Sequence, residues 1–191
     1  MLSDSLTMTI FDVLAEQHGQ IDALFREVQS ALGGHKNRVA RARFQELSTK
    51  LIACMRTEHA IVYPRFAFLA GLEDEVVRAI REHDKIEQAI NHLRLGALAP
   101  DLFQGALTRL QLLVADHVET EEWILFPVAR LRLTTEDARQ LADEFRAFQP
   151  VAAAAAAPSI TYFVDAAACT RAQRDTERQA PVPQLVVVEA A

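Results

Sequence analysis

Apolar residues recur at steps of three and four positions along four segments of the chain, and this spacing places their side chains on one face of an α-helix. The segments cover residues 11–32, 44–61, 76–93 and 103–131. Gly33, Gly71 and Gly96 mark the ends of the first three, as is usual where a helix stops. The pattern therefore predicts four amphipathic helices.

Connections of only a few residues join these helices, which favours antiparallel neighbours. We therefore expect an all-α fold, an antiparallel up-down-up-down four-helix bundle, with a short extra helix over residues 135–148. After Pro150 the helical spacing gives way to the runs "VAAAAAAPS" and "PVPQLVVVEAA". Residues 8–148 are predicted to form one domain, and residues 149–191 a low-complexity, largely disordered tail.

The chain contains an internal duplication. The stretch "TEHAIVYP", residues 57–64, resembles "TEEWILFP", residues 120–127, and "LAEQHGQIDALF" resembles "AIREHDKIEQAI". The polar residues of the two halves are similarly spaced: 54 − 18 = 36 positions separate His18 from Cys54, and 117 − 83 = 34 separate His83 from His117. The two predicted helical hairpins are therefore interpreted as repeats of one unit.

Polar side chains interrupt the apolar face of every predicted helix. The interruptions are potential metal ligands: His18, Cys54 with Glu58, His83, and His117 with Glu121. A carboxylate buried without a partner costs several kcal/mol, so these positions demand a compensating cation. Residues four apart lie on one helix face about 6 Å apart along the axis, which lets a His and a Glu reach a common ion.

We therefore predict a metal site of imidazoles and carboxylates, which suits iron, manganese or zinc. Two facing carboxylates can bridge a pair of ions. The predicted ligands are His18, Glu58, His83, His117 and Glu121.

Four further residues are less certain members of this site. Cys54 has three interpretations: a thiolate ligand, a small core residue, or a position replaced by His59 after the helix rotates by about 100°. Glu87 follows His83 by four positions and borders the apolar face. Glu122, the counterpart of His59 in the second half, lies next to that face.

The helical spacing also assigns residues to the core or away from the site. Tyr63 falls off the apolar face and is expected not to approach a metal. Ile124 and Leu131 fall on the apolar face and are expected in the core. Core packing is also the preferred explanation for Trp123 and Phe126, and Pro64 and Pro127 are expected to kink their helices.

Composition narrows the partners. The net charge is −6 with a pI near 5.5, and no face is rich in Lys and Arg, so a nucleic-acid partner is not expected. The N-terminus lacks the features of a signal peptide, and no run approaches the roughly 20 apolar residues of a membrane helix. Two cysteines, Cys54 and Cys169, form no disulfide framework, which favours a reducing cytoplasm.

Three stretches, "MTIFDVLAEQHGQIDALF", "EHDKIEQAI" and "HVETEEWILFP", together resemble the hemerythrin-like, HHE cation-binding family, over about residues 8 to 131. The resemblance implies a four-helix bundle around a non-haem di-iron site with histidine ligands and bridging carboxylates. His18 and His83 match the helices that carry a lone His. His117 with Glu121 matches one His-x-x-x-Glu helix, and Cys54 with Glu58 the other.

Two departures from the family's pattern bear on function. Cys54 stands where a histidine is expected, and Glu87 stands where oxygen-carrying hemerythrins have a second histidine. Fewer imidazoles and more carboxylates stabilise ferric iron, which disfavours reversible oxygen carriage.

The expected function is therefore an iron-binding protein that senses or responds to oxygen, peroxide, nitric oxide or iron, as in a stress response. An oxidoreductase acting on peroxide or nitric oxide and a metal-free interaction protein are the alternatives. The sequence predicts no oligomeric state.

Overall fold

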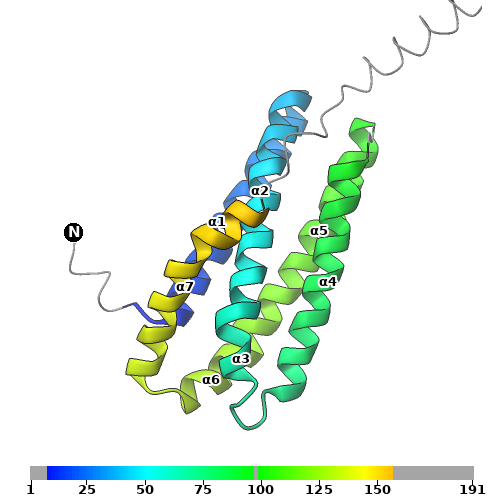
Figure 1. The fold of residues 1–191 in the computed structure, drawn as a ribbon. Helices are drawn as coiled ribbons and strands as arrows, with labels where there is room; N and C mark the ends of the chain where they lie inside the picture. Colours follow the sequence, from blue (N-terminus) through cyan, green and yellow to red (C-terminus); the bar gives the residue numbers. More distant parts are fainter. Residues whose placement is uncertain (1–7, 97–98, 157–191) are drawn as a thin grey trace, which may run out of the picture. The chain divides into compact units, whose positions relative to one another are not determined.

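The computed structural model describes residues 8–96 and 99–156, and these residues form helices and connecting turns without a strand (Figure 1). The predicted all-α class is thus confirmed for this part of the chain. The helices in chain order are α1 (Ile10–Gly33), α2 (Asn37–Thr57), η2 (Glu58–Val62), α3 (Tyr63–Phe66), α4 (Glu73–Leu95), α5 (Pro100–Thr120), η3 (Glu121–Leu125), α6 (Phe126–Arg132) and α7 (Thr135–Ala156).

Two helical hairpins hold most of the long helices. α1 packs along α2, and α4 packs along α5, while α7 lies against both α1 and α2 (Figure 1). Arg94 links α4 to α2 by donating from Nε to the Ser48 hydroxyl at 3.0 Å. The interior is filled by large side chains, among them Phe25, Phe66, Phe103, Phe145, Leu47 and Ile86. None of the described helices is both long and apolar enough to cross a membrane.

α7 is longer than the predicted short helix over residues 135–148. It continues through Pro150 to Ala156, where an alanine run favours helix. Its buried side chains, Leu141 and Phe145 among them, pack on the rest of the fold. The predicted tail thus begins inside α7, and its residues 157–191 lie outside the described part of the chain.

Two π-helical turns interrupt the predicted second and fourth helices at equivalent places. η2 directly follows α2, and η3 directly follows α5. The Tyr63 N–H donates to the Glu58 carbonyl, and the Phe126 N–H to the Glu121 carbonyl, five residues earlier in each case. A turn closed this way contains one residue more than an α-helical turn. The residues that follow are therefore rotated by about 100° relative to a continuous α-helix.

This rotation overturns part of the predicted core. Beyond Glu121 the buried residues include Leu125 and Phe126, whereas Ile124 and Leu131 are exposed, the latter to 85%. Trp123, also expected in the core, is 76% exposed.

The same rotation follows Glu58, where Val62 is buried and Ile61 only half-buried. Pro64 and Pro127 stand at the start of α3 and α6, where a residue without an N–H is tolerated. Each proline therefore follows a break in the α-helical hydrogen-bond ladder.

Candidate metal centre

The five predicted ligands meet in the interior although they come from five different elements. His18 lies on α1, Glu58 on η2, His83 on α4, His117 on α5 and Glu121 on η3, and all five are buried. Each helix contributes through the polar position on its buried face. The packing of the helices therefore gathers donors from both halves of the chain at one level.

The ligand atoms form two overlapping groups, each with three atoms within 4.8 Å of one another. One group contains Glu58, His83 and His117, and the other contains His18, Glu58 and Glu121. Glu58 belongs to both. Four of the five donors, His18, Glu58, His83 and His117, line a small cavity of about 20 Å³, which is room for about one water molecule or ion.

Short distances connect the donors. His83 Nε2 lies 2.8 Å from His117 Nε2 and 3.3 Å from Glu58 Oε2. His18 Nε2 lies 3.2 Å from Glu121 Oε2. The three imidazoles therefore all direct Nε2 towards the carboxylates.

The residues present fit a bound cation. Glu121 is only 1% exposed, and its Oε2 accepts no hydrogen bond despite its burial. Leaving a buried carboxylate oxygen unsatisfied is costly, and a metal ion would satisfy it. The imidazole and carboxylate donors, as a set, suit iron, manganese or zinc. These five residues would hold the ion or ions.

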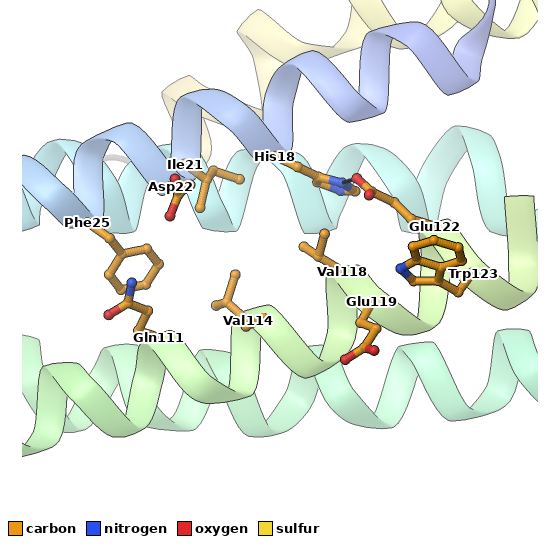
Figure 2. Close-up of a pocket in the computed structure, with 11 residues that line it drawn as sticks. His18, Ile21, Asp22, Phe25, Gln111, Val114, Val118, Glu119, Glu122 and Trp123 are labelled. Atoms are coloured by element: carbon orange, nitrogen blue, oxygen red, sulfur yellow. Dashed lines mark hydrogen bonds and ion pairs between the residues drawn. The ribbon is translucent and has the colours of Figure 1, made fainter.

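Each inward-facing histidine is held at its outer nitrogen by a second residue. Nδ1 of His18 contacts Glu122 Oε1 at 2.9 Å. Figure 2 shows these two side chains next to each other. Nδ1 of His117 contacts Glu82 Oε2 at 3.1 Å. Such contacts fix the ring orientation and leave Nε2 for a metal.

The third histidine, His83, has an imidazole partner in place of a carboxylate. Its Nδ1 lies 2.9 Å from His59 Nε2, and the two rings stack with centroids 4.9 Å apart. His59 and Glu122, predicted as less certain ligands, thus occupy the outer positions of two ligand histidines. They belong to neither of the two ligand groups.

The two carboxylates of the centre have different protonation preferences. Burial raises the pKa of Glu58 to about 7, and the neighbouring Glu121 acts in the same direction. Burial also opposes ionisation of Glu121, but His117 and His18 outweigh it and lower its pKa to about 2.

Burial also disfavours the charged form of His18, yet the nearby Glu121 carboxylate, with Oε2 at 3.2 Å from His18 Nε2, outweighs it and raises the pKa of His18 to about 9. The metal-free centre thus holds protons that an incoming cation must displace.

Cys54 contacts a ligand without joining either ligand group. Its Sγ lies 3.0 Å from Glu58 Oε1 and donates a hydrogen bond there. Burial raises the pKa of this thiol well above its usual range, and the Glu58 charge adds to the effect. Cys54 is therefore placed as a buried protonated thiol that holds the carboxylate shared by the two groups.

Tyr63 lies at the centre, contrary to the expectation from its off-face position. It is 2% exposed, and its hydroxyl donates to Glu121 Oε1 at 2.8 Å and lies 3.3 Å from His83 Nε2. The π-helical turn η2 rotates it inward by the extra residue. Pro64 was the available signal, because a proline within a helical pattern breaks the ladder on which the periodicity rests.

The internal duplication extends to the surroundings of the ligands. Tyr63 stacks on His83 with centroids 5.4 Å apart, and its counterpart Phe126 stacks on His18 at 6.2 Å. The π-helical residue of one half holds the lone histidine of the other: His59 holds His83, and Glu122 holds His18. Within the described part of the chain, only the first half provides a phenol hydroxyl.

Two glutamates of α4 differ from expectation. Glu87, predicted as a less certain ligand, is half-buried on α4 and belongs to neither ligand group. Glu82, absent from the predicted set, holds His117. No periodic signal identified Glu82, because its role depends on α5 lying beside α4.

The fold and the site of this chain, with histidine and glutamate donors buried between packed helices, are those of the class of helical metal-binding proteins. This chain belongs to the hemerythrin HHE cation-binding domain family, whose model matches residues 9–129. It is also similar to a protein described as a DNA nickase from Nostoc sp. (strain PCC 7120 / SAG 25.82 / UTEX 2576), with 28% identity over 145 residues. That match covers 76% of this chain and only 40% of the relative. No solved structure matches the chain.

Proposed function

We propose that this chain is a hemerythrin-type protein that holds two non-haem iron ions within an antiparallel four-helix bundle. The observation that carries the proposal is the place of Glu58 in both groups of ligand atoms. A carboxylate has two oxygens and can bridge two ions, so one ion would take His83 and His117, and the other His18 and Glu121. Each ion would share Glu58.

Iron is favoured because the two groups contain only imidazole and carboxylate donors, three of the first and two of the second. Zinc and manganese accept the same donors and are the alternatives. The thiol of Cys54, which zinc would favour, donates a hydrogen bond to Glu58 instead of joining the ligand groups.

The proposed role is sensing of, or response to, oxygen, peroxide, nitric oxide or iron. Bound iron would supply a redox-active centre with open coordination positions, since each group provides only three protein atoms. The protein's own residues hold the donors, exclude bulk water and keep Glu121 charged. The buried free thiol of Cys54 suits a reducing cytoplasm.

The test is iron analysis of the protein purified after expression with iron, combined with its optical spectrum. We expect about two ions per chain in the natural protein and a loss of at least one in His117→Ala. His92→Ala is the matched control, because His92 is exposed on α4 and outside both groups. A metal content below about one ion per chain that His117→Ala leaves unchanged would contradict the proposal and favour a metal-free interaction protein.

An oxidoreductase acting on peroxide or nitric oxide is the second candidate. The observation in its favour is that two oxidisable side chains, Cys54 and Tyr63, each donate a hydrogen bond to a ligand carboxylate. For peroxide, disproportionation of two molecules into two waters and one oxygen needs no added reductant. Oxygen release by the iron-loaded protein that disappears in Glu58→Ala would support this role over binding alone.

DNA nicking, the activity named for the Nostoc relative, is not proposed for this chain. The match covers 40% of that protein, and this chain's net charge of −6 disfavours binding to phosphates. Supercoiled plasmid incubated with the metal-loaded protein should stay supercoiled. Nicking that exceeds an equal amount of free iron would reopen the question.

A further inference from the structure

Lys50 lies at the junction of three helices, where α2 packs against both α1 and α7 (Figure 1). Its side chain is half-buried, and Nζ donates a hydrogen bond to Oε1 of Gln17 on α1 at 2.7 Å. The same oxygen of Gln17 accepts a hydrogen bond from Nε2 of Gln149 on α7. A neutral amide therefore holds the amine in place, and Lys50 belongs to neither group of metal ligands.

This environment favours the uncharged form of the amine. In the described part of the chain, Lys50 forms no ion pair with a carboxylate. A half-buried ammonium without a counter-ion is poorly solvated, and burial lowers the pKa of Lys50 below its usual value. Cys54 and Glu16 oppose this shift in pKa without reversing it. At neutral pH the amine of Lys50 is therefore unprotonated, and so nucleophilic, more often than that of an exposed lysine.

Lys50 also lines a groove between α2 and α7. The groove has a volume of about 540 Å³, which suits a small organic molecule. Gln45 and Thr49 offer hydrogen-bonding groups, and Pro150 and Ala153 add apolar surface from α7. Glu46 is the other charged residue among the described residues of the lining. The apolar surface disfavours a charged ligand, and the Glu46 carboxylate repels an anion.

We propose that Lys50 is a covalent modification site for small, uncharged aldehydes that bind in this groove. The inference goes beyond the proposed iron centre and does not depend on it. Nζ attacks the carbonyl carbon and forms a C–N bond, while the electron pair of the C=O double bond moves to the oxygen, which takes up a proton. Loss of that oxygen as water leaves an imine. One amine and one aldehyde thus give one imine and one water, with no oxidant or reductant.

The chain provides internal controls, because Lys36 and Lys85 are its other two lysines and both are exposed. The full-length protein would be incubated with butanal near neutral pH, with cyanoborohydride present to trap the imine as a stable secondary amine. Peptide mass spectrometry measures the labelled fraction of each lysine over time. We expect Lys50 to be labelled several-fold faster than the other two lysines, and this difference should disappear in urea. Equal or slower labelling of Lys50 in the folded protein would overturn the proposal.

A first variant tests the neutral partner of the amine. Gln17→Glu keeps the shape of the side chain and gives Lys50 a charged partner, which stabilises the ammonium. Labelling of Lys50 by butanal should therefore slow to the rate of Lys85 in a protein whose circular dichroism is unchanged. An unchanged labelling rate of Lys50 would show that the neutral environment does not make this amine reactive, which would overturn the proposal.

A second variant tests the groove. Ala153→Phe fills part of it and should slow labelling of Lys50 by butanal more than labelling by formaldehyde, which is smaller. Ala154→Phe is the matched control, because Ala154 is exposed on α7 and does not line the groove. If Ala153→Phe left both rates unchanged, the aldehyde would not reach Lys50 through this groove, and the proposal would fail.

Discussion

The hydroxyl of Tyr63 donates a hydrogen bond to Glu121 Oε1 at 2.8 Å, across the boundary between the two repeated halves of the chain. This contact exists because the π-helical turn η2 turns Tyr63 towards the interior. Phe126 occupies the equivalent place in the second half and has no hydroxyl. The duplicated fold thus holds its two carboxylates by different means, Glu121 by a phenol and Glu58 by the thiol of Cys54.

Tyr63→Phe should weaken metal binding about 10–100-fold, as expected when a ligand loses its outer hydrogen-bond partner. The ring remains, so the free energy of unfolding of the metal-free protein should fall by only about 1 kcal/mol. Metal competition with a chromophoric chelator measures the affinity. Tyr162→Phe is the control, because Tyr162 is the other tyrosine of the chain. An unchanged affinity in Tyr63→Phe would show that the phenol does not position Glu121.

Cys54→Ala should retain metal, because Cys54 acts as a hydrogen-bond donor to Glu58 and lies outside both ligand groups. We expect an affinity loss of about tenfold, the lower end for an outer partner. The spectrum of the cobalt-loaded natural protein should lack a thiolate charge-transfer band. A strong band that Cys54→Ala removes would identify Cys54 as a ligand and contradict the placement of its thiol.

Metal removal should lower the thermal stability of the natural protein. A cation bound only to the folded state adds about 4 kcal/mol when its free concentration is about 1,000 times Kd. Calorimetry with iron and then with excess chelator should therefore show a clear drop in Tm. Glu121→Gln, which keeps the side-chain shape and removes the charge, should show little difference between the two conditions. An equal drop in Glu121→Gln would indicate that the metal binds elsewhere.

Phe145→Ala should lower the free energy of unfolding by about 3–5 kcal/mol, because the ring is fully buried on α7 and its removal leaves a cavity. Phe68→Ala is the matched control, since Phe68 is 89% exposed. Urea denaturation of the metal-free variants measures both. A small effect of Phe145→Ala would mean that α7 is only loosely attached to the rest of the fold.

The start of α1 makes a pH-dependent contribution to the stability of the folded protein. Asp12 Oδ2 accepts hydrogen bonds from the Thr9 N–H at 2.8 Å and the Thr9 hydroxyl at 2.6 Å, and these bonds lower the Asp12 pKa. Because the folded pKa lies below the unfolded one, the stabilisation is present above the unfolded pKa of about 4 and is lost as pH falls through the folded pKa.

Asp12→Asn should therefore lower the free energy of unfolding by about 1 kcal/mol at pH 7 and leave it unchanged at acidic pH. Denaturation curves of both proteins between neutral and acidic pH test this. If the difference in the free energy of unfolding between the two proteins persisted unchanged at low pH, the effect would come from the shape of the side chain instead of its charge.

Much of the candidate centre could be predicted from the sequence because none of the five candidate ligands lies beyond the first residue of an irregular turn. The uninterrupted three-and-four spacing of a helix holds at five positions, so the sequence could place these residues on the buried faces of their helices. They are His18, Glu58, His83, His117 and Glu121. The spacing fails directly after Glu58 and Glu121, where a hydrogen bond from five residues away replaces one from four. The spacing of apolar residues gives no sign of this change in the backbone hydrogen bonds.

The sequence by itself determined the helical faces, the candidate ligands that lie on them and the duplication that relates the halves. Only the tertiary structure decided which donor holds which ligand. The partners of His18, His83 and His117 come from other helices, at Glu122, His59 and Glu82, and depend on how those helices pack. The structure likewise placed Tyr63 inward and Leu131 outward, because one extra residue in a π-helical turn rotates the residues that follow it by about 100°.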